Sequence, residues 1–172
     1  MKKLIMTIAV IFCAASVSAQ SWIDSATDAK NWSAGVRLGS GFQAVAEYTF
    51  SSDNYFEGRF GMSWCNGGAS LMADFTALYN WHICDMDWTP DTGKWFFDAG
   101  CGVVVGGRSH YAYVGAAGSA KFGIAFRNVP LKLSVDWTPY IGPHIAYGGG
   151  YSYSEFNEYG FANFGVSCVY RF

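Results

Sequence analysis

The last fifteen residues of the chain, from Glu158 to Phe172, alternate in character. Every second side chain, counted back from the terminus, is apolar: Phe172, Tyr170, Cys168, Val166, Phe164 and Ala162. The intervening side chains are mostly small or polar: Arg171, Val169, Ser167, Gly165 and Asn163. A period of two predicts a β-strand whose two faces meet different surroundings. Any fold proposed for this chain has to supply both surroundings.

The same period recurs in seven earlier segments, separated by turn-forming residues. The expected strands are 32–39, 42–50, 55–64, 71–82, 95–105, 115–127, 131–137 and 158–172. The expected connections are 51–54, 83–94 and 128–130 on the side of the chain ends, and 39–41, 65–69, 106–114 and 140–157 on the other. Strands of this length cross a bilayer when they are tilted. The predicted fold class is all-β: an eight-stranded antiparallel up-and-down transmembrane β-barrel.

Periodicity alone does not say which face of the strands points outward, because a soluble lipocalin-like barrel alternates too and keeps its apolar row inside. Two features favour a barrel in lipid. The polar row carries five charges of each sign, which suit a narrow interior where they pair. These are Arg37, Glu47, Glu57, Arg59, Asp74, Asp98, Lys121, Arg127, Lys132 and Asp136.

The second feature is the placement of the large rings, which gather near both ends of the strands around an aliphatic middle. One set falls near the side of the chain ends: Trp32, Tyr48, Phe50, Tyr79, Trp81, Trp95, Phe97, Phe126, Tyr170 and Phe172. The other set is Phe42, Trp64, Trp137 and Tyr159. Two aromatic girdles around an aliphatic band are typical of a barrel surface in lipid.

Residues 1–19 have the pattern of a cleavable signal peptide. Lys2 and Lys3 precede an apolar run, and small residues surround the expected cleavage after Ala19. The alternative is a membrane anchor, but the apolar run is shorter than the roughly 20 residues that span a bilayer. We expect residues 20–31 to be a periplasmic N-terminal lead-in and residues 32–172 to form the barrel domain.

Composition excludes one class of partner and leaves one question open. Charged residues make up 14% of the chain and aromatic residues 19%. Removing Lys2 and Lys3 from the 11 basic residues leaves nine, against 13 acidic ones, so we expect no nucleic-acid partner. Four cysteines follow the leader: Cys65, Cys84, Cys101 and Cys168. They are either disulfide-bonded, as an even count in an exported chain suggests, or simply small apolar residues.

The apolar terminal strand that ends on Phe172 resembles the last strand of small eight-stranded outer-membrane β-barrel proteins of Gram-negative bacteria, including those of the Bacteroidota type. The stretch from Leu133 to Pro139 resembles the penultimate strand of that group. The resemblance extends from Trp32 to Phe172. It implies a location in the outer membrane, contact with outer-membrane lipid, and assembly by the barrel assembly machinery, which recognises the C-terminal strand.

Three kinds of function remain open. The first is a non-enzymatic membrane scaffold or surface-binding protein whose lumen is plugged by charged side chains, with an extracellular ligand at the Tyr- and Gly-rich loop 140–157. The second is a narrow, porin-like channel. The third is a lipid- or peptide-processing enzyme at the rim, using Ser109, His110, His144 and Glu155. We expect no catalytic, cofactor-binding or metal-binding residues, and we expect His82 in the lumen or at an interface.

Overall fold

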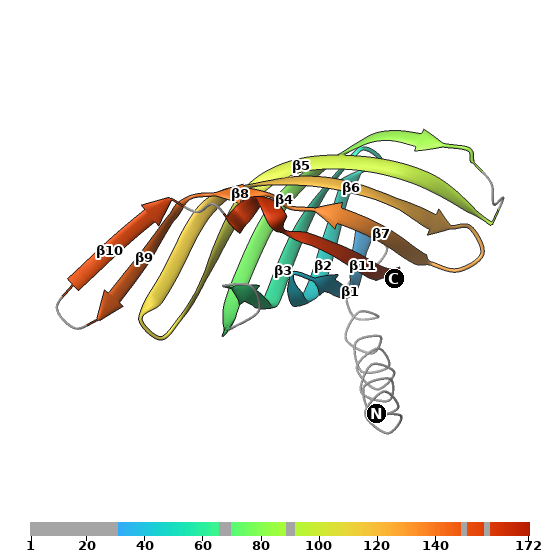
Figure 1. The fold of residues 1–172 in the computed structure, drawn as a ribbon. Helices are drawn as coiled ribbons and strands as arrows, with labels where there is room; N and C mark the ends of the chain where they lie inside the picture. Colours follow the sequence, from blue (N-terminus) through green and yellow to red (C-terminus); the bar gives the residue numbers. More distant parts are fainter. Residues whose placement is uncertain (1–30, 66–69, 89–91, 149–150, 157–158) are drawn as a thin grey trace, which may run out of the picture.

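A computed structural model describes residues 31–65, 70–88, 92–148, 151–156 and 159–172. The predicted signal peptide over 1–19 and residues 20–30 of the predicted lead-in lie outside these ranges. Eight strands form the barrel (Figure 1): β1 (Trp32–Gly39), β2 (Gly41–Ser51), β3 (Asn54–Cys65), β4 (Ser70–Met86), β5 (Gly93–Arg108), β6 (Tyr111–Phe126), β7 (Leu131–Trp137) and β11 (Phe164–Arg171). No helix in the described part is long and apolar enough to cross a membrane.

The barrel is closed and antiparallel throughout. Each strand from β1 to β6 pairs with the next, and β7 pairs with both β6 and β11. β11 returns to pair with β1, where Val36 lies opposite Cys168, and this pairing closes the ring. The predicted eight-stranded antiparallel β-barrel is therefore confirmed. We call the end where β1 begins and β11 stops the terminal end; there the amide of Phe172 donates to the carbonyl of Trp32 at 3.1 Å. The opposite end is the distal end.

Three connections differ from the prediction because neighbouring strands continue to pair beyond the expected turns. β4 runs to Met86 and β5 begins at Gly93, so residues 83–86 and 93–94 of the expected 83–94 turn are strand. A bulge between His82 and Cys84 allows this extension. In place of the loop 106–114, only Ser109 and His110 connect β5 to β6. His110 has φ of 67°, a left-handed conformation that His tolerates better than β-branched residues do.

The expected loop 140–157 is also largely strand. It contains β8 (Tyr140–Ile141), β9 (Pro143–Gly148) and β10 (Tyr151–Phe156), which extend the sheet beyond the barrel. The last barrel strand is shorter than the expected 158–172. It starts at Phe164, after a short 3-10 helix, η3 (Tyr159–Ala162), whose Phe161 carbonyl accepts a hydrogen bond of 2.7 Å from Trp137 Nε1.

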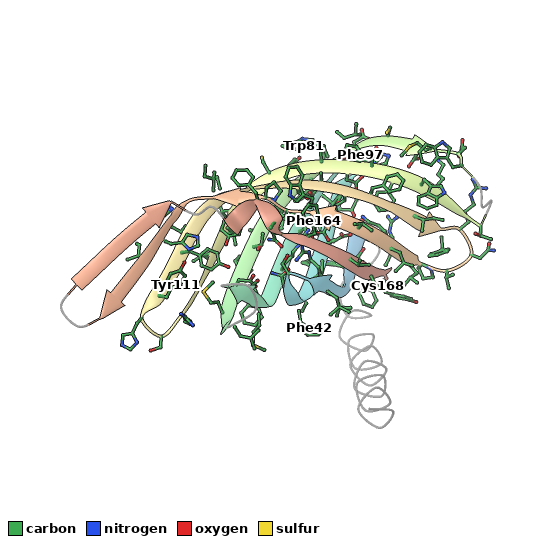
Figure 2. The ribbon with its side chains drawn as sticks, viewed as in Figure 1. Phe42, Trp81, Phe97, Tyr111, Phe164 and Cys168 are labelled. Carbon is green, nitrogen blue, oxygen red and sulfur yellow. The ribbon has the colours of Figure 1, made fainter. Side chains whose placement is uncertain are left out.

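As predicted, the strands carry apolar side chains on their outer face and charged side chains on their inner face. Large apolar side chains lie on the outside: Phe60 is 65% exposed and Val135 is 56% exposed. Figure 2 shows Phe42, Trp81 and Phe97 on this outer surface. Of the ten charges expected inside, eight are buried: Arg37, Glu47, Glu57, Arg59, Asp74, Asp98, Lys121 and Asp136. Lys132 is partly buried. Arg127 was predicted wrongly: β6 ends at Phe126, so Arg127 lies in the turn and is exposed.

Candidate functional site: the filled lumen and the outer sheet extension

Asp136 on β7 is bonded to two arginines and two hydroxyl groups inside the barrel. Its Oδ1 accepts from Arg37 Nε at 2.7 Å and lies 3.3 Å from Arg59 Nη1. Its Oδ2 accepts from Ser167 Oγ at 2.9 Å, and Thr138 Oγ1 donates to Oδ1 at 3.1 Å. These groups come from four strands or their ends, and all are almost fully buried. Two buried arginines therefore share one carboxylate, which two hydroxyls also solvate.

Glu57 on β3 is a second buried carboxylate that several donors surround. Its Oε1 accepts from Arg59 Nε at 2.5 Å, and its Oε2 accepts from Asn80 Nδ2 at 3.0 Å. Lys121 on β6 donates to the same carboxylate and also reaches Glu47 Oε1 at 3.3 Å. Glu57 is completely buried. A carboxylate in such a place is stable only because cations and donors replace the water it has lost.

Lys132 continues the network toward the terminal end. Its Nζ lies 3.3 Å from Glu47 Oε2 and 3.8 Å from Asp98 Oδ2. The ammonium also lies 4.4 Å from the centre of the Tyr55 ring and 4.9 Å from that of Phe96, within the range of cation–π attraction. The Tyr55 hydroxyl donates to Asp98 at 2.8 Å. Aromatic faces and carboxylates together hold this cation at the edge of the filled region.

The network continues toward the distal end through neutral groups. Arg37 Nη1 donates to Gln43 Oε1 at 3.2 Å, and Arg37 Nη2 donates to Asn163 Oδ1 at 3.1 Å. The amide nitrogen of Gln43 donates to both oxygens of Asp74, at 2.9 and 2.8 Å. Ser63 Oγ also bonds to Asp74. We call the set Arg37, Glu47, Glu57, Arg59, Asp74, Asp98, Lys121, Lys132 and Asp136 the interior network.

An apolar cluster lies in the interior between β4, β5 and β6. Leu78 has no exposed surface and packs with Met72, Val104, Tyr113 and Ala117. An eight-stranded barrel is just wide enough for side chains to fill. Polar and apolar side chains divide this space between them, and the largest fully buried ones are Arg37, Arg59 and Lys121.

The terminal end of the barrel is more open. A cavity of about 170 Å³ lies there, with Glu47, Lys132, Leu131 and Arg171 in its lining. His82 sits near this end between two carboxylates: its Nδ1 is 2.8 Å from Asp98 Oδ1, and its Nε2 is 3.2 Å from an oxygen of Asp85. His82 therefore lies partly buried at the terminal rim of the interior, in contact with the buried Asp98.

At the distal end, the chain after β7 continues along β6 without a change of register. Ala120 faces Trp137, Ala117 faces Tyr140 and Tyr113 faces His144, so both strands advance by equal steps. The regular pairing is interrupted near Pro139, which has no N–H to donate, although its carbonyl still accepts from the amide of Gly118 at 2.7 Å. We call β8, β9 and β10 the outer sheet extension.

A layer of rings anchors the outer sheet extension to β6. Tyr113 stacks on Tyr140 and on His144, with centroids 5.4 and 5.3 Å away, and Tyr140 and His144 are nearly parallel at 8°. Tyr111, labelled in Figure 2, bonds to His144 Nδ1 through its hydroxyl. A Cβ at Gly106 would lie 2.5 Å from the Tyr113 ring, so the ring lies flat where only glycine leaves room. These contacts make the base of the extension a packed structure.

The residues considered for catalysis are only partly brought together. Ser109 Oγ lies 2.8 Å from His110 Nδ1 at the exposed β5–β6 turn. His144 and Glu155 face each other in the β9–β10 register. The register places His144 three residues along the strand from the level of His110, roughly 10 Å away. The structure thus forms two separate pairs instead of one constellation of nucleophile, base and orienting group.

The described residues contain neither a metal-binding cluster nor a disulfide bond. Within them, no three His, Cys, Asp or Glu residues are grouped so as to hold a metal ion. Cys84, Cys101 and Cys168 are free thiols. Cys101 on β5 and Cys168 on β11 belong to strands that are not neighbours in the sheet.

Several interior partners carry no charge, and the sequence analysis did not name them as partners of the charged residues. Gln43, Asn80, Thr138 and Ser167 are all almost fully buried and all bond to members of the interior network. Apart from Thr138, which lies just beyond β7, each lies on the inward row of its strand. Their phase with the charged residues is the signal that could have assigned these three to the interior network.

Replacing Gly165 with Val should weaken the interior network. A Cβ at this position would lie 2.6 Å from the guanidinium carbon of Arg37, which Asp136 holds in place. We expect the free energy of unfolding to fall by about 1–3 kcal/mol, as for other overpacked interiors. Gly58→Val is the matched control, because nothing lies within 4 Å of a Cβ there. Equal urea midpoints for the two variants would contradict the packing of Arg37 over Gly165.

The chain matches no family model, no curated protein and no solved structure in the comparisons made.

Proposed function

We propose that this protein is a non-enzymatic outer-membrane β-barrel with a lumen closed by its interior network, serving as a membrane scaffold that presents the outer sheet extension as a binding surface. In this proposal it belongs with the small barrels of Gram-negative bacteria that its terminal strand resembles. A signal peptide over residues 1–19 directs export. The barrel assembly machinery engages β11, and outer-membrane lipid surrounds the barrel.

The observation that carries the membrane location is the inverted arrangement of side chains. Phe60, Val135 and Val166 are each more than half exposed, whereas Arg37, Arg59 and Lys121 are almost completely buried. A water-soluble domain gains stability from the opposite arrangement. In a bilayer the apolar exterior contacts lipid, and a closed ring of strands has no open edge that would expose unpaired backbone groups to it.

The positions of the aromatic residues support the proposal that the bilayer surrounds the middle of the strands. Near the terminal end, Trp32, Tyr48 and Phe50 contact one another in sequence, with ring centroids 5.0 and 5.1 Å apart. Toward the distal end, Trp137 stacks on Phe164 at 6.1 Å. Aromatic rings prefer the two interfaces of a bilayer. The proposal therefore puts the terminal end in the periplasm and the distal end at the cell surface.

The filled lumen supports a scaffold over a channel. Ions crossing the barrel would have to separate buried pairs such as Arg37–Asp136 and Lys121–Glu57. A narrow conductance is the second candidate, and the cavity of about 170 Å³ at the terminal end favours it, because that cavity could serve as a vestibule. Its lining includes Glu47 and Lys132, which pair with the buried Lys121 and Asp98 of the interior network.

Three measurements test this proposal together: cell fractionation, gel mobility with and without boiling, and planar-bilayer recording. The protein should fractionate with the outer membrane, and its gel mobility should change on boiling, because a closed barrel resists detergent until heated. In planar bilayers the folded protein should give no steps of the size seen with large diffusion pores. Recovery as a detergent-free periplasmic monomer would refute the membrane location, and a stable large conductance would refute the closed lumen.

The enzyme hypothesis receives less support from the geometry. A hydrolase of this kind needs a nucleophile, a base and an orienting group in one place. Ser109 and His110 lie at an exposed turn, where water screens the electrostatic interactions on which catalysis depends. His144 is instead part of the ring layer that packs the outer sheet extension onto β6. The proposal therefore assigns these histidines structural roles.

A further inference from the structure

We propose that the free edge of β10 is a docking site for an extended segment of another polypeptide, which adds to the outer sheet extension as a further strand. This inference rests on the proposed surface-binding function and names its binding mode and the class of its partner. The partner is recognised mainly through its backbone, as in other cases of strand addition.

β10 stands out by its pairing. Each barrel strand has two hydrogen-bonded neighbours, and β9 lies between β6 and β10. Among the described strands of more than two residues, β10 is alone in pairing on one side only. The two-residue β8 also pairs only with β6, but η3 lies against it. Figure 1 shows β9 and β10 reaching past the end of the barrel, so β10 is the outermost strand of the sheet.

The backbone groups that β10 leaves unpaired can be assigned from its register. Arg108 faces Tyr111 across the two-residue loop between β5 and β6, and residues that flank such a loop bond to each other. Bonding alternates along an antiparallel strand, so the next residue of β6, Ala112, bonds to Ile145 of β9. The β9 residues on either side of Ile145 then bond to β10. Tyr151, Tyr153 and Glu155 therefore bond to β9, whereas Ser152, Ser154 and Phe156 direct their N–H and C=O groups to the free edge.

The sequence of β10 lacks the usual protection of an edge strand. Natural edges are blunted by proline, by lysine or by bulges. Residues 151–156 read YSYSEF, with no proline, no basic residue and a single acidic one, and Tyr and Phe favour strands. Nor can such an edge lie in hydrocarbon, where unpaired backbone groups are too costly. β10 therefore stands in water, where a partner strand can reach it.

The outer sheet extension is also anchored at its base. The rings of Tyr113, Tyr140 and His144 pack together, and β9 pairs with β6 through Ala112 opposite Ile145. An ordered edge binds more tightly than a loop of equal length, because less conformational entropy is lost on binding. Because β9 pairs with β6, the direction of β10 is fixed by the barrel strands.

A second copy of this chain in the same membrane is a poor occupant for this edge. Two copies inserted in the same direction are related by a two-fold axis along the bilayer normal. If β10 is tilted as strands of membrane barrels are, by about 35–45°, this axis makes the two β10 strands cross, and they cannot run antiparallel. Isologous pairing of strand edges requires antiparallel strands. The edge therefore fits an extended segment of a different polypeptide, free to approach in the required direction.

The test uses the full barrel in nanodiscs and a fluorescein-labelled heptapeptide, Thr-Val-Thr-Tyr-Thr-Val-Thr, as a charge-free strand former. Without peptide, the amides of Ser152, Ser154 and Phe156 should exchange with deuterium faster than those of Tyr153 and Glu155. Peptide should slow exchange at the first three alone. The same peptide N-methylated at alternate residues should not do so, because it cannot complete the ladder.

Matched variants separate backbone pairing from other binding. Ser154→Pro removes one donor from the free edge and should weaken peptide binding by about tenfold, the equivalent of one hydrogen bond. Ser154→Ala keeps that donor and should bind as the wild type does. Equal affinities for the two variants would overturn the inference. So would equal binding of the N-methylated peptide, or a protein dimer that Ser154→Pro dissociates.

The outcome for this inference is distinguishable from that for the proposed function. Failure of the protein to insert into nanodiscs as a heat-modifiable barrel would count against the membrane barrel itself. Insertion with normal gel mobility, combined with slow exchange at Ser152 and Ser154 before peptide is added, would mean that the edge is already covered. That result would refute the docking site and leave the barrel standing.

Discussion

Replacing Glu57 with Gln should lower the free energy of unfolding by about 3–5 kcal/mol, the usual cost of removing one partner from a buried ion pair. The glutamate has no exposed surface, and Arg59 and Lys121 both donate to it. The amide of Gln keeps the shape but supplies no charge, so two buried cations each lose one of their two carboxylate partners. Urea unfolding of the barrel in phospholipid vesicles, followed by tryptophan fluorescence, measures the loss.

A second substitution should recover part of this stability. Adding Lys121→Met to Glu57→Gln removes one of the two cations that lost a partner, while Arg59 still reaches Asp136 at 3.3 Å. The double variant should therefore be more stable than Glu57→Gln alone. Additive losses from the two substitutions would mean that the two residues do not interact.

An exposed ion pair serves as the control for the buried one. Lys94 Nζ lies 2.6 Å from Asp85 Oδ2, closer than most pairs in the lumen, but both side chains are more than one-third exposed. Lys94→Gln should leave the urea midpoint unchanged within error, because water and salt screen such pairs. A loss as large as that of Glu57→Gln would show that burial is not what makes the interior network sensitive.

Replacing Phe60 with Arg should destabilise the barrel by about 2–4 kcal/mol in a bilayer, the cost measured for a cation on the lipid face near the midplane. Phe60 lies near the middle of β3 and is 65% exposed. Phe60→Leu keeps an apolar side chain at the same position and should have a much smaller effect. Reversible unfolding in vesicles of defined lipid composition provides the comparison.

The same substitution discriminates between the two barrel types. On a water-soluble barrel, an Arg at so exposed a position would change stability by no more than about 0.5 kcal/mol and would improve solubility. In a bilayer the ion has to be dehydrated or has to deform the membrane. A neutral result for Phe60→Arg in vesicles, with Phe60→Leu also neutral, would therefore contradict the membrane location.

The barrel itself was predictable because a strand has a period of two whatever surrounds it. The alternation in β4, with Leu71, Phe75 and Tyr79 in one row and Asp74 in the other, predicts both a strand and its two faces. Eight such segments are needed before a ring can close. The polar row of charges of both signs predicted the filled interior, and eight of those ten charges are buried.

The ends of the strands were less predictable, because pairing with a neighbour decides how far a strand continues. β5 and β6 stay paired up to Arg108 and Tyr111, so a segment that reads as a Gly-rich loop becomes strand. Arg127 keeps the inward phase of β6 but lies past its last residue, so the interior never reaches it. Local sequence carries little information about either limit.

The tertiary structure alone decided which charges meet. Arg37 and Asp136 lie 99 residues apart in the chain, and only closure of the ring through β1, β11 and β7 brings them to 2.7 Å. The unpaired edge of β10 is equally a product of the assembled sheet, since an edge exists only relative to the strands already paired. The sequence by itself determined the strands and their two faces, because side-chain alternation is a local property of the backbone. Pair identities and the open edge required the closed fold, because they depend on strand neighbours and register.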